Sequence, residues 1–463
     1  MQLPRKSSVS RRDFLKNTGR VAAATTLAAA MVPQVHAGEN NTIQLALVGC
    51  GGRGTGAAAD AMSVKSVPIK LVAMADAFQD RLDGSYRGIK SQFRNQVDVP
   101  QERKFVGFDA YQKAMDCLKP GDIVIFATPL AFRWVHFGYA VQKGLNVFME
   151  KPLTADGPSS RKLLKLAEEA SQKNLKAGVG LMSRHSRALQ ELAKRIQDGE
   201  IGDLVLIRGY RMHGPLGSML SPPKPADKTE VEYQIRRFHS FLWASGGCYS
   251  DFLIHIIDHC GWMKGAWPVK AQGIGGRHYR GDSVDQNLDS YAVEYTFPDD
   301  TKFLMEGRYM PGCQDDAYHS FAHGTKGTAI ISRGGDCGGP SATFKGLGSS
   351  RKNRIWESGG YPNDEGPYRN EWNDLVDAIL KNTPYNEVKR GVEASLVTSM
   401  GRMSAHTGRV ITFEQMLNCE HEMAPNLEKI TMDGPAPLMG DANGKYPVPQ
   451  PGMYTKFEYK PRA

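Results

Sequence analysis

Several features that mark particular classes of protein are scarce in this 463-residue chain. Its seven cysteines include no CxxC pair and no zinc-ligand spacing, and their odd number leaves at least one of them unpaired. The sequence has one sizeable apolar run, Val21 to Met31, which is too short and too rich in alanine and threonine to span a bilayer comfortably. The formal charge of +9 falls to roughly +4 without the basic N-terminal segment, which argues against a nucleic-acid surface.

The N-terminal segment has the features of a targeting signal. Ser10 to Lys16, "SRRDFLK", precedes the short apolar run, and Val35 to Ala37 offers a small-residue cleavage site. This arrangement resembles a twin-arginine export signal, so we expect residues 1–37 to be a signal peptide and the mature protein to be periplasmic. An uncleaved membrane anchor is the alternative. Because the twin-arginine route carries folded proteins, the signal suggests a cofactor that is bound before export.

A glycine-rich turn follows the signal. The strand-like segment 42–48 leads into "GCGGRG", residues 49–54, and then into a stretch that favours a helix. This context is typical of a dinucleotide-binding turn, in which glycines let the backbone approach a pyrophosphate at a helix N-terminus. A second strand-like segment, 69–75, ends on Asp76, whose carboxylate suits a ribose diol and would repel a 2′-phosphate, so NAD is favoured over NADP. A plain tight turn with Asp76 as a helix cap is the alternative.

Two further strand-like segments complete the pattern. Residues 121–129 and 145–149 are continuous apolar runs of the kind that parallel sheets bury on both faces, separated by a helical segment around 134–143. This alternation predicts an α/β fold with an N-terminal doubly wound parallel sheet of the Rossmann type, whose ligands lie at the carboxyl ends of the strands. The predicted NAD-binding residues are Gly49, Gly51, Gly52, Arg53, Gly54, Asp76, Ala127, Thr128, Pro129, His136, Glu150 and Lys151.

The tripeptide Glu150-Lys151-Pro152 ends the fourth strand on that edge of the sheet. Together with a later G-G-x-x-x-D-x-x-x-H-x-x-D segment, Gly246 to Asp258, and with 324–329 and 372–409, it resembles the Gfo/Idh/MocA oxidoreductases. The resemblance implies that a small carbohydrate or cyclitol is the substrate and that the protein is a homo-oligomer, a dimer or tetramer. The expected domains are residues 38–165 for NAD binding, 166–420 for substrate binding and 421–463 as an extended C-terminal arm, with disorder of the arm as the alternative.

The second motif brings acid–base groups together. If Ser250 caps a helix, Asp251, His255 and Asp258 share one of its faces at i, i+4 and i+7. His255 is then a candidate base for a hydroxyl proton, and Asp251 a group that orients it. The resemblance implies catalytic roles for Lys151, Asp251 and His255. A structural ion pair between Lys151 and Glu150 is one alternative; a metal site is another, but no ligand set is complete, so we predict no metal.

The second domain is predicted to be α+β, with an open, mostly antiparallel sheet, because its strand-like segments follow one another directly. These segments are 204–212, 269–277, 290–297, 301–308 and 328–332, whereas 215–227 and 334–366 are expected to be long loops. Arginines and a tryptophan suit the hydroxyls and the apolar face of a sugar ring. The predicted substrate-binding residues are Arg184, His185, Arg211, Arg237, Trp243, Asp251 and His255, with Tyr210 and His239 as weaker candidates.

These patterns predict an exported NAD-dependent oxidoreductase that acts on a secondary hydroxyl of a sugar, glycoside or cyclitol. Since free NAD is scarce outside the cytoplasm, the cofactor is expected to stay bound and to be recycled by a second substrate. Two other functions stay open at this point: a glycoside hydrolase that works through transient oxidation and elimination, and a binding protein that retains NAD without turnover.

Overall fold

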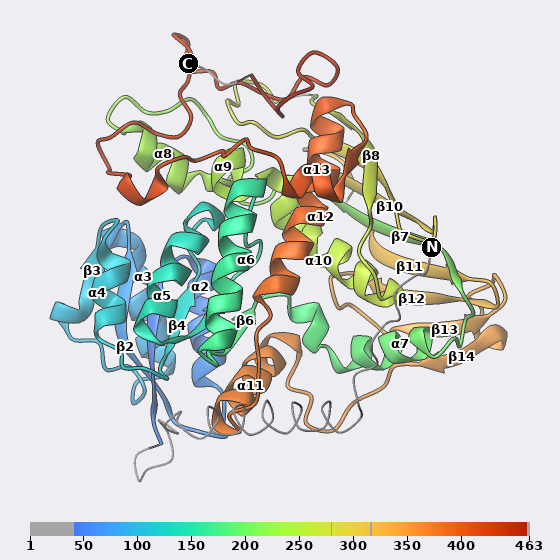
Figure 1. The fold of residues 1–463 in the computed structure, drawn as a ribbon, viewed down its shortest axis with the longest axis horizontal. Coiled ribbons are helices and arrows are strands. Elements are labelled where there is room, and N and C mark those ends of the chain that lie inside the picture. Colours follow the sequence, from blue (N-terminus) through green and yellow to red (C-terminus); the bar gives the residue numbers. More distant parts are fainter. Residues whose placement is uncertain (1–40, 279, 315–316, 461–463) are drawn as a thin grey trace, which may run out of the picture. The chain divides into compact units, whose positions relative to one another are not determined.

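Six parallel strands form the first sheet of the computed structural model, which describes residues 41–278, 280–314 and 317–460. In spatial order they are β3 (Lys104–Val106), β2 (Ile69–Asp76), β1 (Ile43–Val48), β4 (Ile123–Phe126), β5 (Asn146–Met149) and β6 (Ala177–Val179). Figure 1 shows this half in blue and teal with its helices, which are α2 (Gly52–Met62), α3 (Gln79–Gln92), α4 (Ala110–Asp116), α5 (Arg133–Lys143) and α6 (Gly157–Gln172). The prediction of a doubly wound parallel sheet is confirmed.

The second sheet has nine strands and is mostly antiparallel, as expected. In spatial order they are β14 (Arg354–Glu357), β13 (Ala342–Lys345), β12 (Gly327–Arg333), β11 (Tyr318–Gly324), β7 (Leu204–His213), β10 (Lys302–Tyr309), β9 (Ser290–Thr296), β8 (Lys270–Gly276) and β15 (Ile411–Thr412). Among the described strand pairs of this second sheet, only β7 and β10 run parallel. The expectation of one long loop over 334–366 was wrong, because the short strands β13 and β14 lie within it.

Helices from the second half pack on both sheets. α10 (Gly247–Lys264) lies on β7 and β10, and α12 (Val388–Thr407) lies on β8, on β9 and on α6 of the first half. α11 (Pro367–Leu380) returns to the first half, where Trp372 packs in the core beside α2. The remaining helices are α7 (Arg187–Gln197), α8 (Glu230–Arg236), α9 (Leu242–Ser245) and α13 (Phe413–Leu417).

α10 begins earlier than the sequence suggested. It starts at Gly247 after Gly246, whose φ of 71° is left-handed, and Ser250 lies inside its first turn. The prediction that Ser250 caps this helix was therefore wrong. The Ser250 hydroxyl instead accepts a hydrogen bond from the Arg402 guanidinium at 2.7 Å. α10 still presents Asp251, His255 and Asp258 in one nearly buried helix.

The C-terminal segment packs on its own chain. Met423, Leu438 and Tyr459 are buried in a hydrophobic cluster with Trp243 of α9. Near its end, Glu458 forms an ion pair with Arg402 of α12, at 2.7 Å between Oε1 and Nη2. The segment is thus tied to the helix that touches both sheets.

The remaining expectations about organisation have mixed outcomes. The predicted signal peptide, residues 1–37, lies outside the described residues, and every described helix is too short or too polar to cross a membrane. The domain boundaries stay a prediction, although β6 of the first sheet lies beyond residue 165. In the part of the chain that the structure describes, all seven cysteines are free.

Candidate active site

The glycine turn between β1 and α2 is shaped for close approach. Gly49 has a φ of +99°, and a Cβ there would lie 2.6 Å from the carbonyl carbon of Ala127. A Cβ at Gly54 would lie 2.0 Å from the Gly49 oxygen, so this position holds α2 tightly against the turn. By contrast, a Cβ at Gly52 would meet no described atom within 4 Å. No described side chain caps the N-terminus of α2, which leaves its N–H groups and positive dipole end available to an anion.

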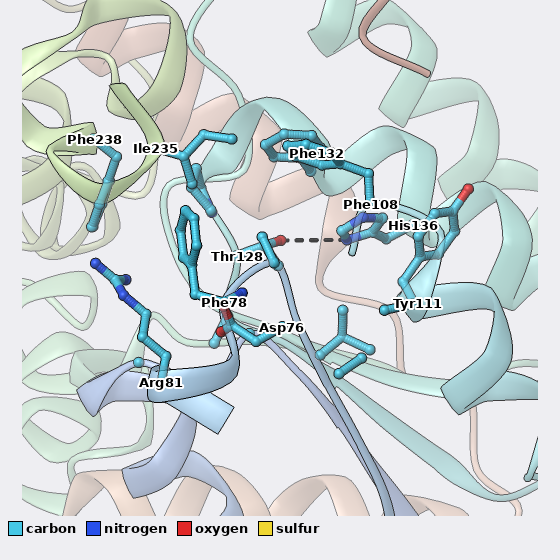
Figure 2. Close-up of a pocket in the computed structure, with 18 of the residues that line it drawn as sticks. Asp76, Phe78, Arg81, Phe108, Tyr111, Thr128, Phe132, His136, Ile235 and Phe238 are labelled. Atoms are coloured by element: carbon cyan, nitrogen blue, oxygen red, sulfur yellow. Dashed lines mark hydrogen bonds between the residues drawn. The ribbon is translucent and has the colours of Figure 1, made fainter. Parts of the chain in front are cut away.

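A cavity of about 290 Å³ opens beside this turn. Figure 2 shows Asp76 at its base, with Phe132, His136 and Tyr111 on one wall and Ile235 and Phe238 reaching in from the second half of the chain. Most of the predicted NAD-binding residues line it, namely Gly49, Gly51, Gly52, Arg53, Asp76, Ala127, Thr128, Pro129 and His136. Sequence reasoning missed its aromatic walls, Phe78, Phe108, Tyr111, Phe132 and Phe238, because their apolar patterns do not distinguish a cavity wall from core.

Asp76 is held by the backbone at the end of β2. Its carboxylate accepts hydrogen bonds from the N–H groups of Cys50 at 2.6 Å and Phe78 at 2.9 Å. Burial raises the pKa of Asp76, and these two backbone donors oppose that rise. Each carboxylate oxygen has a further lone pair, so the group retains the capacity to accept bonds from a diol.

A smaller cavity of about 130 Å³ adjoins the first and shares Thr128, Phe238 and His239 with it. Glu150, Lys151 and Asp251 line this second cavity. Two predicted groups of residues, one from the end of β5 and one from α10, therefore meet beside the glycine turn.

Lys151 points to α10 rather than to its neighbour Glu150. Its ammonium donates to the main-chain oxygen of Asp251 at 2.7 Å and lies 3.8 Å from the Asp251 carboxylate. Glu150 instead pairs with Arg53, at 2.8 Å between Oε1 and Nε. Burial raises the pKa of Glu150, although Arg53 and Lys151 act in the opposite direction. Glu150 thus holds the glycine turn through Arg53, and Lys151 lines the second cavity without pairing with Glu150.

Asp251 is an ionised carboxylate between cationic and polar groups. Burial alone would raise its pKa, but Lys151, His239 and His255 outweigh burial and hold the pKa of Asp251 at about 2. His239 Nε2 lies 3.4 Å from Asp251 Oδ2, and His239 Nδ1 accepts from the Ser218 backbone N–H at 3.2 Å. Since a backbone N–H can only donate, His239 Nδ1 is the acceptor, which leaves a hydrogen on Nε2, facing the carboxylate.

His255 lies one turn further along α10 and is 6% exposed. Burial lowers its pKa to about 4, so the imidazole is neutral near pH 7 and able to accept a proton. Its Nδ1 has no hydrogen-bond partner among the residues described. An unpartnered nitrogen on a buried neutral histidine is a suitable acceptor for a substrate hydroxyl.

Six of the seven predicted substrate residues, all but Asp251, are absent from the lining of both cavities, and four of the six bond to other parts of the chain. Arg184 forks onto the Asp258 carboxylate, with Nη2–Oδ1 at 2.8 Å, and His185 Nδ1 lies 2.7 Å from Asp374 Oδ2. Arg237 donates to Ser221 and Leu220, while Trp243 is 1% exposed and bonds Gln234. These side chains are already committed to protein partners. Of the other two, Arg211 lies against α10 and bonds the Phe252 main-chain oxygen, and His255 belongs to α10 itself.

Comparisons with known proteins find sequence relatives over part of the chain and similar folds over most of it. No family model matches the chain. The scyllo-inositol 2-dehydrogenase (NAD(+)) of Bacillus subtilis is 27% identical over 215 residues, which cover 46% of this chain and 52% of that protein. The chain spans between 33% and 52% of the length of the curated relatives it matches.

Two solved structures match over nearly their whole length. The scyllo-inositol dehydrogenase of Lactobacillus casei, with bound NAD(H) and scyllo-inositol, has a TM-score of 0.57 at 22% identity and covers 81% of this chain and 99% of its own. The aldose-aldose oxidoreductase of Caulobacter crescentus, complexed with glycerol, has a TM-score of 0.61 at 15% identity, covering 80% and 99%. The chain therefore has the fold of Gfo/Idh/MocA-type oxidoreductases, and part of its sequence is distantly similar to that of inositol dehydrogenases.

Proposed function

We propose that this chain is an NAD-dependent oxidoreductase of the Gfo/Idh/MocA family that acts on a secondary hydroxyl of a cyclitol, sugar or glycoside. One observation carries the proposal: Lys151 and Asp251 line a cavity that adjoins the glycine turn, and a neutral His255 lies one turn along α10 from Asp251, close enough to lower the pKa of Asp251. Alcohol oxidation needs a base for the hydroxyl proton, and a carboxylate and an ammonium can stabilise the charges that develop. The distant similarity to inositol dehydrogenases supports the substrate class.

The residues around the first cavity fit NAD. The open N-terminus of α2 would hold the pyrophosphate, and Asp76 would accept hydrogen bonds from a ribose diol while repelling a 2′-phosphate. The aromatic walls, among them Phe108 and Phe132, would enclose an apolar base. When bound, NAD would accept the hydride from the carbinol carbon of the substrate.

The protein's own groups would manage the proton. His255 is neutral near pH 7, so its imidazole is free to take the hydroxyl proton. Asp251 is ionised and would stabilise the resulting imidazolium. Lys151, held on a main-chain oxygen 2.7 Å away, retains two N–H groups with which to orient the substrate oxygen and stabilise its developing charge.

A turnover assay tests the proposal. Protein purified without added nucleotide is denatured and analysed by mass spectrometry for NAD or NADH, and is then supplied with inositols, aldoses and aryl-glycosides. We expect bound NAD(H) and a keto product, and a Lys151→Met variant that keeps NAD but loses at least about 100-fold in kcat. A Lys151→Met variant that retains the wild-type rate would contradict the assignment.

The same assay separates the alternatives. Release of the aglycone from aryl-glycosides with no net NADH and no keto-sugar would indicate the redox-neutral hydrolase. Retained NAD without turnover of any compound would indicate a binding protein. Bound NAD(H) that is re-oxidised by a second sugar would support the expected recycling within one site.

We further propose that residues 1–37 direct export to the periplasm and that the protein is a homo-oligomer. Ile274 of β8 is 74% exposed, whereas a Cβ at the neighbouring Gly273 would contact Ala405 of α12. Ile274 therefore lies on the face of the second sheet opposite α12, where burial against another copy would stabilise an oligomer. Light scattering of wild type and of Ile274→Asp tests the proposed oligomer. We expect a larger mass for wild type than for the variant, and a monomeric wild type would contradict the proposal.

A further inference from the structure

A group of buried polar atoms next to His255 lacks hydrogen-bond partners among the described residues. These atoms include Arg211 Nε, His255 Nδ1 and Tyr309 Oη, whereas Tyr318 Oη and Asp336 Oδ1 are buried beside them and interact with each other. Buried polar atoms in native proteins are nearly always hydrogen-bonded, so several exceptions in one place call for a ligand. Their residues come from α10, β7, β10, β11 and the connection between β12 and β13.

Contacts show that these side chains are neighbours. Arg211 Nη1 lies 3.7 Å from Asp336 Oδ1, and the Arg211 guanidinium lies 4.5 Å from the centre of the Tyr318 ring. Asp336 is also the strongest charged influence on the pKa of both His255 and His259. The cluster is therefore continuous with the catalytic face of α10.

Asp336 reaches this place on a glycine-rich turn, "GGDCGG", residues 334–339. Gly334 has a φ of +72° and Gly335 one of +154°, and a Cβ at Gly338 would lie 2.2 Å from the Arg333 oxygen. Ser183, from another part of the chain, holds the turn in place. Its hydroxyl lies 3.4 Å from the main-chain oxygen of Asp336 and 3.2 Å from the Cys337 sulfur. The turn is thus built to hold one carboxylate in a fixed position.

Arg211 and Asp336 offer complementary chemistry to a substrate. The guanidinium donates to the Phe252 main-chain oxygen, which places it beside Asp251. At 3.7 Å the Arg211–Asp336 pair is longer than a hydrogen bond, so Arg211 Nε retains a free donor, and the Asp336 carboxylate, which also interacts with Tyr318, retains further lone pairs. Adjacent hydroxyls on a ring need a donor and an acceptor side by side, and the Phe252 and Tyr318 rings supply apolar surface for its C–H groups.

We propose that Arg211 and Asp336 form a subsite for two adjacent hydroxyl groups of the substrate ring and that Asp336 sets the preference for substrates with such a diol. This proposal rests on the proposed function, since the subsite would hold the substrate ring while His255 takes the proton of the hydroxyl that is oxidised. It adds a specificity-determining residue that belongs to neither sequence motif.

The test compares scyllo-inositol with all-cis cyclohexane-1,3,5-triol, which keeps secondary ring hydroxyls but has no two on adjacent carbons. In wild type we expect kcat/KM to favour scyllo-inositol by at least about 100-fold, because a site built to bond a hydroxyl rejects an analogue without it. Asp336→Asn should raise KM for scyllo-inositol about 10-fold or more, change kcat less than about 3-fold and reduce the discrimination to about 10-fold or less. Asp282→Asn, at an exposed position, is the matched control and should match wild type.

Calorimetric titration of scyllo-inositol into the NAD-loaded protein separates the two proposals. If wild type oxidises scyllo-inositol and Asp336→Asn keeps its KM and discrimination, the subsite is overturned and the oxidoreductase stands. If wild type binds scyllo-inositol without turnover and Asp336→Asn binds it about 10-fold more weakly, the subsite stands and the oxidoreductase fails. If wild type neither binds nor oxidises either compound, the subsite is overturned, and the oxidoreductase is then decided by the aldoses and aryl-glycosides of the turnover assay. Arg211→Lys, which keeps the charge but loses the planar fork, should show the same loss as Asp336→Asn.

Discussion

Replacing Glu458 by glutamine should destabilise the protein strongly although the residue lies far from the catalytic groups in the sequence. Glu458 accepts from Arg402 through both oxygens, at 2.8 Å from Nε and 2.7 Å from Nη2, and lies 2.7 Å from His406 Nδ1. The Arg402 side chain is fully buried and that of Glu458 is 3% exposed. The amide of glutamine keeps the shape but leaves the buried guanidinium without its counter-charge.

Two routes to the magnitude agree. Burial alone would raise the pKa of Glu458, but Arg402 and His406 outweigh it and hold the pKa at about 2, against an ordinary value of 4.5. That difference corresponds to about 3 kcal/mol of unfolding free energy near pH 7. Removal of one partner from a buried ion pair costs about 3–5 kcal/mol in other proteins. We therefore expect Glu458→Gln to lower the free energy of unfolding by about 3 kcal/mol.

Urea unfolding followed by circular dichroism measures this, with Glu428→Gln as control. Glu428 is an exposed glutamate of the same C-terminal segment, so its change should stay within about 0.5 kcal/mol. Since the folded pKa of Glu458 is depressed, its contribution is complete above pH 4.5 and is lost as the pH falls toward about 2. The difference between wild type and variant should shrink over that range. A loss under 1 kcal/mol at pH 7, or one that does not vary with pH, would refute the reasoning.

Three further predictions concern the site. Asp76→Ala should weaken NAD binding about 10-fold to 100-fold in a fluorescence titration, and unaltered affinity would exclude a ribose contact. His239→Phe keeps the ring packing against Phe238 and Phe252 but removes the donor to the Asp251 carboxylate, so kcat should fall about 10-fold. His239→Gln restores a donor and should recover most of the lost rate. Equal kcat values for wild type and His239→Phe would contradict this role. His255 must be neutral to accept a proton, and its pKa is about 4. The value of kcat/KM should therefore be level above pH 5 and fall as the pH drops through about 4. A fall that begins near pH 6.5 would count against His255 as the base.

The parts of the molecule that follow from local backbone rules were readable in the sequence. The glycines at 49 and 54 and the apolar runs of β1, β2 and β4 predicted the first sheet, because tight turns and buried parallel strands leave local signatures. Strands β13 and β14 were missed because each has four residues in a segment rich in glycine and serine. Short strands of this kind are determined by their sheet neighbours rather than by their own composition.

Side-chain partnerships at long range were not readable. Arg184 looks like a substrate contact in sequence, but its partner Asp258 lies 74 residues away and is fully buried, which only the fold brings to it. Conversely, Asp336 stood unnoticed in an expected loop. A charged residue flanked by glycine pairs was the available signal, since such glycines indicate a turn with a fixed conformation.

The anchoring of Lys151 has a consequence for how this site can change during evolution. Its ammonium donates to the main-chain oxygen of residue 251, and a main-chain oxygen stays in place whatever side chain that residue carries. A substitution at 251 would therefore alter the charge beside the substrate without removing the lysine's principal support. The charge next to Lys151 and the position of its ammonium can therefore vary independently of each other.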